Sequence, residues 1–294
     1  MPAPEADATA SRLAVPGYAR DACRRTCLPA ELPFFNDPEM VARLVRTGLE
    51  PVVHTLPSRC RIADLGGADG YVAQALCGYL AGRGIDAAGV VVDANLESLR
   101  VAQKRGLAIV PCNLESVRLA PVNVAVIRLV MQYNSLAAQG RILDRVFECL
   151  APGGILLLQA EGGTLANVSF RNRLSRFLQS VPGVGGPALN CRWISTAGMT
   201  RLVRARGFQL RLVCEDFLAF ETALDDLLLL AWTRFHGTPT SSEAAGRLFD
   251  SFCEYANTLA ARVLERGVDT GLLNTGRGIG FSSRHALILA TRPS

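Results

Sequence analysis

The chain has 294 residues, of which 49% are hydrophobic and 19% charged, and its formal net charge is +5. This composition is that of a folded globular protein, which excludes disordered, collagen-like and coiled-coil chains. The longest uncharged apolar runs, residues 153–160 and 227–232, are far shorter than the roughly 20 residues of a membrane-spanning helix. The first fifteen residues hold Glu5 and Asp7 and no continuous apolar stretch, so we expect no secretory signal, no membrane partner and a cytoplasmic location.

The basic residues are almost all arginine, with Lys104 the single lysine among 31. They are spread along the chain, so the sequence predicts no nucleic-acid partner. The nine cysteines lie mostly in apolar patterns, which favours free thiols in a reducing compartment. Cys23 and Cys27 have no second pair at ligand spacing, so no metal site is predicted.

The first expected helix begins at Asp37, whose side chain can cap it, and has Pro38 at its first position. Apolar residues recur on one face as far as Pro51, which should end or kink the helix. We expect residues 1–57 to form an N-terminal helical cap segment.

Between residues 58 and 163, short apolar runs alternate with amphipathic helical patterns. Such runs are typical of buried parallel strands, and the patterns between them fit helices that cover both faces of a sheet. The sequence therefore predicts an α/β fold with a Rossmann-like, doubly wound sheet. The five strands expected here are residues 61–65, 88–92, 107–110, 122–129 and 154–159.

The second half of the chain is less regular and predicts two insertions into the core. Residues 164–195 form an expected cap insertion, after which Ser195 or Thr196 should cap a helix that ends at Gly207. Residues 196–220 continue the core and include a sixth strand. Residues 221–283 form a helical cap insertion, with Thr240 and Glu243 at capping-box spacing before a long helix. Residues 284–294 supply an antiparallel last strand, for a seven-stranded sheet.

The strongest chemical signal is residues 62–71, IADLGGADGY, in which a strand runs into a glycine-rich turn and then a helix. Glycines let the backbone approach a ligand closely, and the free N–H groups of the following helix face that ligand. The dinucleotide fingerprint G-x-G-x-x-G, started at Gly66, needs glycine where Ala68 and Tyr71 stand. A dinucleotide site is therefore not predicted.

This segment resembles the D-x-G-G-G-x-G turn of the class I S-adenosylmethionine-dependent methyltransferases, with Ala68 as the one departure from glycine. The resemblance extends to Asp93 at the end of the second strand, to PCNL at 111–114 and to LAPGG at 150–154. It covers about residues 58–163, 196–220 and the last strand. It implies S-adenosyl-L-methionine as the cofactor.

The resemblance also implies roles for residues of the first two strand ends. Gly66, Gly67 and Gly70 would shape the turn around the amino-acid end of the cofactor, with Asp64 near its amino group. A carboxylate that stabilises the turn is the alternative for Asp64. Asp93, with Ala94 beside it, would accept hydrogen bonds from both ribose hydroxyls, which suits two carboxylate oxygens.

Further implied contacts follow the third and fourth strands. Asn113, with Cys112, would take the place of the family's usual acidic contact to the adenine amino group, and Leu114 would pack on the adenine ring. Residues 128–132, including Arg128 and Met131, would lie under the sulfonium.

Methyl transfer from a sulfonium is an in-line displacement that needs no covalent nucleophile, so the protein must orient the acceptor, exclude water and remove a proton where one leaves. The insertions and N-terminal helices are expected to cover the carboxyl edge of the sheet, giving a pocket for a small, fairly apolar acceptor. This arrangement resembles small-molecule O-, N- and C-methyltransferases of secondary metabolism. The expected lining is Phe34, Phe35, Trp193, Phe217, Phe220, Trp232 and Phe235.

Glu161, directly after the fifth strand, is the first candidate general base, because partial burial can raise the pKa of a carboxyl toward neutrality. Tyr18, Tyr133 and His236 are the second candidates. Two other functions stay open, namely methylation of RNA or a protein side chain, and non-catalytic binding by a protein that keeps the fold. The apolar helices of the insertions also suit a homodimer face.

Overall fold

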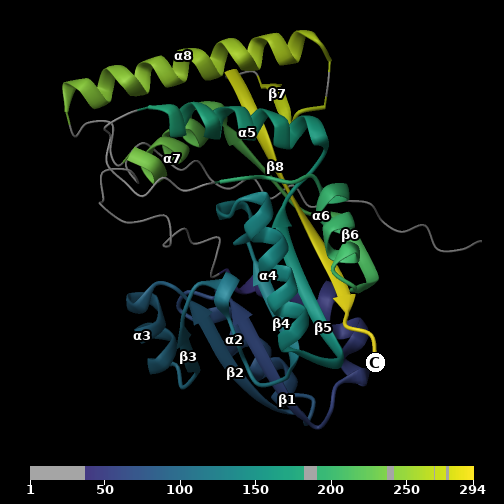
Figure 1. The fold of residues 1–294 in the computed structure, drawn as a ribbon. Helices are drawn as coiled ribbons and strands as arrows, with labels where there is room; N and C mark the ends of the chain where they lie inside the picture. Colours follow the sequence, from purple (N-terminus) through teal and green to yellow (C-terminus); the bar gives the residue numbers. More distant parts are fainter. Residues whose placement is uncertain (1–36, 182–190, 237–241, 268, 276–277) are drawn as a thin grey trace, which may run out of the picture.

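The computed structural model describes residues 37–181, 191–236, 242–267, 269–275 and 278–294. One eight-stranded sheet has the order β3-β2-β1-β4-β5-β8-β6, and β7 pairs with β8 outside this path (Figure 1). Strands β1 to β5 pair in parallel, whereas β8 is antiparallel to its neighbours, so the expected sheet is confirmed. The strands are β1 (Arg59–Leu65), β2 (Asp86–Asp93), β3 (Ala108–Pro111), β4 (Val122–Arg128), β5 (Leu150–Glu161), β6 (Gln209–Ala223), β7 (Leu272–Thr275) and β8 (Gly278–Thr291).

Helices bury both faces of this sheet. One face packs against α4 (Leu136–Cys149) and α6 (Thr196–Ala205), and Gly207, at φ +89°, follows α6 as expected. The other face packs against α1 (Pro38–Leu44) and α2 (Tyr71–Ala81), while α3 (Leu96–Lys104) covers the β2–β3 side. Because the strands between them are buried on both faces, the carboxyl edge is where a ligand can approach the core.

The N-terminal helical segment begins as the sequence indicates. The Asp37 side chain accepts a hydrogen bond from the Glu39 N–H at 2.9 Å and caps α1. Beyond α1 the chain continues as a π turn (Val45–Leu49) and a 3₁₀ turn (Glu50–Thr55). Pro51 lies at the start of the 3₁₀ turn, where its missing N–H leaves no hydrogen bond unmade.

A cap stands over the carboxyl edge of the sheet, at the top of Figure 1, and has its own hydrophobic cluster. It consists of α5 (Leu165–Ser180), α7 (Leu224–His236), α8 (Glu243–Glu265), β7 and the far halves of β6 and β8. Expecting residues 221–283 to be helical was therefore wrong in part, since they also contain β7 and the start of β8, and the sheet has eight strands instead of seven. Ser242 caps α8 by accepting from the Ala245 N–H at 3.1 Å, and Thr240 lies outside the described residues.

Candidate active site

The β1–α2 turn has the tight backbone geometry of a ligand-binding loop. Gly66, Ala68 and Gly70 have φ values of +75°, +46° and +74°. The Gly66 N–H donates to the Val92 carbonyl at 2.7 Å, and a Cβ at Gly66 would lie 2.4 Å from a methyl group of Val130. Glycine is thus required at Gly66, and Ala68 holds a left-handed conformation that L side chains disfavour.

Asp93 ties the end of β2 to this turn. One carboxylate oxygen accepts from the Ala68 N–H at 3.0 Å, and the other accepts from the Asn95 N–H at 2.8 Å. Each carboxylate oxygen can accept a second hydrogen bond, so both remain able to bind a ligand hydroxyl. The carboxylate is half-buried, and Ala94 beside it is exposed.

Asp64 lies beneath the turn and is 2% exposed. Its carboxylate accepts from the Ala73 N–H at 3.2 Å, and a Cβ at Gly67 would lie 2.4 Å from its carboxyl carbon. Burial raises the pKa of Asp64 to about 6, although Arg128 and the Ala73 N–H act in the opposite direction. Asp64 therefore makes a contact that stabilises the turn, which is the alternative to a place near the amino group of the cofactor.

The end of β4 carries a second non-glycine residue in the left-handed region, Leu129 at φ +56°. Its N–H donates to the Gln159 carbonyl at 2.9 Å, which joins this turn to β5. Beside it, burial lowers the pKa of Arg128, while Asp64 and Asp69 favour its charged form. Ala68 and Leu129 are the two positive-φ residues other than glycine in the described chain, and such strain concentrates at functional sites.

The residues expected around the adenine and the sulfonium lie partly inside the core. Asn113 is exposed, and its side-chain oxygen accepts from the Glu115 N–H at 2.9 Å. Cys112 is half-buried, and burial raises the pKa of its thiol. Leu114 and Met131 are 7% and 1% exposed within the core cluster, which leaves these two side chains little surface for a ligand.

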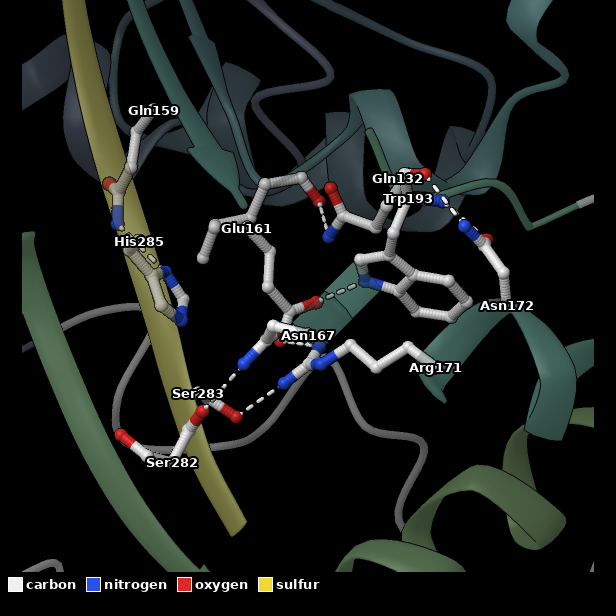
Figure 2. Close-up of polar contacts among 11 residues, drawn as sticks. Gln132, Gln159, Glu161, Asn167, Arg171, Asn172, Trp193, Ser282, Ser283 and His285 are labelled. Carbon is white, nitrogen blue, oxygen red and sulfur yellow. Dashed lines mark hydrogen bonds and ion pairs between the residues drawn. The ribbon is translucent and has the colours of Figure 1, made fainter. Parts of the chain in front are cut away.

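Glu161 forms a largely buried polar cluster with the cap (Figure 2). One carboxylate oxygen pairs with Arg171 of α5, and the other accepts from the Trp193 indole N–H at 2.8 Å. Burial alone would raise the pKa of Glu161, but Arg171, His285 and Trp193 together lower it to about 2. The expectation of a pKa raised toward neutrality is therefore wrong, because the cap supplies a buried cation that the sequence pattern did not indicate.

Further hydrogen bonds fix the cap side of this cluster. Arg171 also donates to the Ser283 hydroxyl of β8 at 2.5 Å, and its guanidinium lies 4.7 Å from the centre of the Phe281 ring. The side-chain nitrogen of Asn172 donates to the Trp193 carbonyl at 2.9 Å, and its side-chain oxygen accepts from the Trp193 N–H at 3.0 Å (Figure 2). Trp193 is thus held against α5 through its backbone and against β5 through its indole N–H.

Strand register places several polar side chains on one face of the sheet at its carboxyl edge. Val126 of β4 pairs with Asp64 of β1, and Arg128 pairs with Gln159 of β5. Glu161 pairs with His285 of β8. Because side chains two residues apart share a face, these groups form a continuous row from the β1–α2 turn to the cap, which we call the polar row. The polar row consists of Asp64, Arg128, Gln159, Glu161 and His285.

The other candidate bases lie in different places. Tyr133 ends a 3₁₀ turn (Met131–Tyr133) after β4 and packs against the cap cluster, close to the carboxyl edge. His236 is buried inside the cap, where its Nε2 lies 2.9 Å from the Leu178 carbonyl oxygen and its ring packs on Trp232. His236 is thus not brought to the turn or to Glu161, and Tyr18 lies outside the described residues.

The aromatic lining is only partly as expected. Trp193 is half-buried beside Glu161. Trp232 and Phe217 are 0% and 1% exposed inside hydrophobic clusters, so expecting them to line a pocket was wrong. The side chains of Phe34, Phe35, Phe220 and Phe235 lie outside the described part of the chain.

Across the described ranges, the seven cysteines form no disulfide with one another, and no group of three or more His, Cys, Asp or Glu side chains could hold a metal ion. No helix in the same ranges is long and apolar enough to cross a membrane.

Sequence reasoning missed the importance of Gln159, Arg171 and His285. A glutamine within the apolar run of the fifth strand was the available signal for Gln159. Arg171 follows Phe170 in a helical pattern, and His285 begins the last expected strand, but nothing local pairs either with Glu161. Their association depends on strand register and on how α5 packs.

No protein-family model and no curated protein matches the chain. Solved structures do match. A candidate methyltransferase from Bacillus halodurans has a TM-score of 0.61 and 14% identity, covering 86% of this chain and 99% of that one. The YcgJ protein from Bacillus subtilis has a TM-score of 0.61 and 16% identity, covering 87% and 99%. The [4+2]-cyclase SpnF has a TM-score of 0.50 and 14% identity, covering 87% and 81%.

At these identities the likeness concerns the fold alone. The protein therefore has the fold of the class I S-adenosylmethionine-dependent methyltransferases.

Proposed function

We propose that this protein binds S-adenosyl-L-methionine at the β1–α2 turn and transfers its methyl group to a small molecule held beneath the cap. The observation that carries the proposal is the left-handed turn through Gly66, Ala68 and Gly70, whose Ala68 N–H is held by the Asp93 carboxylate. This brings bare backbone and one carboxylate together at the carboxyl ends of neighbouring parallel strands, where ligands of such sheets bind.

The side chains present suit that cofactor. Asp93 retains acceptor capacity for two ribose hydroxyls, and Asp64 lies beneath the turn as a second carboxyl group. The cofactor would supply an electrophilic methyl group with a neutral thioether as leaving group. The protein's part is to align the acceptor and to exclude water, and orientation can supply roughly 7 to 11 kcal/mol.

The cap supports a small acceptor over a polymer. Its helices α5, α7 and α8 pack through their own hydrophobic cluster, and the Glu161–Arg171 pair joins them to β5. A covered edge of this kind suits a molecule that can be enclosed.

Calorimetry tests the proposal directly. We expect saturable binding of S-adenosyl-L-methionine to the full chain and at least a tenfold weaker affinity in Asp93→Ala. Asp86→Asn, which changes an exposed carboxylate on the same strand, is the matched control and should bind like wild type. Absence of binding to wild type, or equal affinity in Asp93→Ala, would contradict it.

A second measurement addresses the acceptor. Transfer of a radiolabelled methyl group to the small-molecule fraction of a cell extract, unaffected by salt, supports the proposal. Labelling of RNA or protein, with RNA turnover falling steeply as salt rises, would favour a polymer substrate instead. Binding without any transfer would favour a non-methylating role, as the name of the cyclase SpnF illustrates for this fold.

A further inference from the structure

The β1–α2 turn rests on the end of α3 as well as on β2. Gly70 is buried there at φ +74°, and a Cβ on it would lie 2.5 Å from a methyl group of Leu107 and 3.0 Å from the Cβ of Ala102. The turn also closes on itself, because the Gly70 N–H donates to the Gly67 carbonyl at 2.8 Å. The backbone at the end of the turn is therefore packed directly against the segment that ends α3 and leads into β3.

The Arg105 side chain links this segment to the turn. Arg105 follows α3 directly, and Gly106, at φ +81°, then turns the chain toward β3. One guanidinium nitrogen of Arg105 donates to the Asp69 carboxylate at 2.9 Å, and a second donates to the Gln74 side-chain oxygen at 3.0 Å. Asp69 belongs to the turn and Gln74 to α2, so one rigid planar group holds both.

Asp69 connects Arg105 to the backbone of the turn. Its second carboxylate oxygen accepts from the Tyr71 N–H, the first of α2, at 3.2 Å. The side chains of Arg105 and Asp69 are 29% and 24% exposed, so the ion pair is partly shielded from water. On the other side of the turn, Asp93 accepts from the Ala68 N–H at 3.0 Å. Two carboxylates thus hold the turn, one from β2 and one that Arg105 fixes from the end of α3.

The turn needs such support because its backbone is strained. Ala68 has φ +46°, a left-handed conformation that is unfavourable for any residue with a Cβ. Strain of this kind persists only where the surrounding structure enforces it. A turn that is free to relax must be ordered again by each ligand that binds, and the cost of ordering it lowers the affinity.

We propose that Arg105 is a positioning residue for the cofactor: through Asp69 it keeps the β1–α2 turn in the shape that S-adenosyl-L-methionine binds. This inference rests on the proposed function and adds a residue that acts through another one.

The charge of Arg105 gives the proposal a definite sign. S-adenosyl-L-methionine carries a sulfonium, an ammonium and a carboxylate, so its net charge is positive, and a cation near the turn disfavours it electrostatically. If Arg105 acted by its charge alone, its loss would tighten cofactor binding. If it acts by positioning the turn, its loss weakens cofactor binding.

Calorimetry with the full chain compares Arg105→Gln with Arg100→Gln. Arg100 is an exposed arginine of α3, and no hydrogen bond or ion pair to another described residue holds its side chain, so it matches the loss of charge. We expect Arg105→Gln to raise the Kd for S-adenosyl-L-methionine about tenfold, because a charge-assisted, partly shielded contact is lost. Arg100→Gln should bind like wild type.

S-adenosyl-L-homocysteine is the second probe. It shares the ribose and the amino-acid end of the cofactor but lacks the sulfonium charge. Because the shape of the turn serves both ligands, Arg105→Gln should raise both Kd values by the same factor.

Two further readouts separate positioning from a general loss of stability. In the cofactor-free chain, the N–H groups of Gly70 and Tyr71 should exchange with solvent faster in Arg105→Gln than in wild type, whereas those of β4 and β5 keep their wild-type rates. Arg105→Lys keeps one donor for Asp69 but not the planar fork, so its Kd should lie between those of wild type and Arg105→Gln. Should Arg105→Gln fail to fold by circular dichroism, Gln74→Met, which removes one of the two contacts, takes its place and should weaken the binding of both ligands alike.

The outcomes are distinct. Unchanged or tighter binding of S-adenosyl-L-methionine by Arg105→Gln, a loss confined to one of the two ligands, or weaker binding without faster exchange in the turn overturns the role of Arg105 and leaves the proposed function standing. Wild type that binds neither ligand overturns the proposed function and this inference with it.

Discussion

Replacing Asp64 by asparagine should change how stability depends on pH. The carboxyl is 2% exposed, and its pKa is about 6 in the folded chain against 3.8 when unperturbed. At 1.36 kcal/mol per pKa unit, a shift of about two units corresponds to about 3 kcal/mol of unfolding free energy. Because the folded pKa is the higher one, this contribution is fully present below pH 3.8 and is lost as pH rises through 6.

Between pH 5 and pH 7 the folded chain loses most of the Asp64 proton, which the unfolded chain has already lost. The unfolding free energy of wild type should therefore fall by about 1.4 kcal/mol relative to Asp64→Asn over this range. His285 acts in the opposite direction there, because its pKa is lowered from 6.5 to about 4. The difference between the two proteins, and not the slope of either, is therefore diagnostic. Asparagine keeps an acceptor for the Ala73 N–H, although Arg128 loses an opposite charge, which offsets part of the absolute gain.

Urea unfolding of the cofactor-free chain, followed by circular dichroism at pH 5, 6 and 7, measures this difference. Asp86→Asn, an exposed carboxylate on β2, is the matched control and should run parallel to wild type. Parallel curves for wild type and Asp64→Asn would refute the reasoning, because Asp64 would then titrate alike in the folded and unfolded chains.

Three other substitutions have directions set by the structure. Ala68→Gly should raise the unfolding free energy by up to about 1 kcal/mol, since relief of the φ +46° conformation outweighs the flexibility gained when unfolded; a lower urea midpoint would count against this. Arg171→Met should cost about 3 to 5 kcal/mol at pH 7 by leaving Glu161 buried without its cation. That cost should shrink as pH falls from 4.5 toward 2, the range in which wild type loses the same stabilisation, and a pH-independent cost would contradict it. Gly66→Ala should abolish cofactor binding in calorimetry, because its Cβ meets Val130 at 2.4 Å, whereas Gly84→Ala, at a positive φ with open space around it, should bind normally; equal binding would refute the close fit.

The core could be predicted because its signals are local. From Arg61 onward, apolar runs that form strands alternate with helical patterns, and the glycine-rich turn after Leu65 is formed by consecutive residues. Asp37 and Ser195 cap helices through their own side chains, as their neighbours in sequence indicate. Such features depend on a few consecutive residues, so one sequence is enough to show them.

The cap and the polar row could not be predicted in the same way. β7 pairs with the start of β8 close to it in the chain, but the residues of both carry no strong alternation, and β8 is placed in the sheet by its pairing with the distant strand β6. The pKa of Glu161 depends on Arg171, ten residues later on a helix whose orientation the sequence leaves open. Register decides that Gln159, Glu161 and His285 share a face, and register is a tertiary property.

The uninterrupted course of β8 limits how the molecule can open. Its lower half pairs with β5 as far as His285, and β6 accompanies it from Gln209 to Ala223, well into the upper layer (Figure 1). β8 passes through both layers as one strand, whereas β6 shifts register against it between Cys214 and Leu218, so a swing of the cap would have to bend β8. A ligand must therefore enter through local movement of the helices around Trp193. Exchanging the cap between homologous proteins would mean cutting β8 in the middle of its backbone hydrogen-bond ladder.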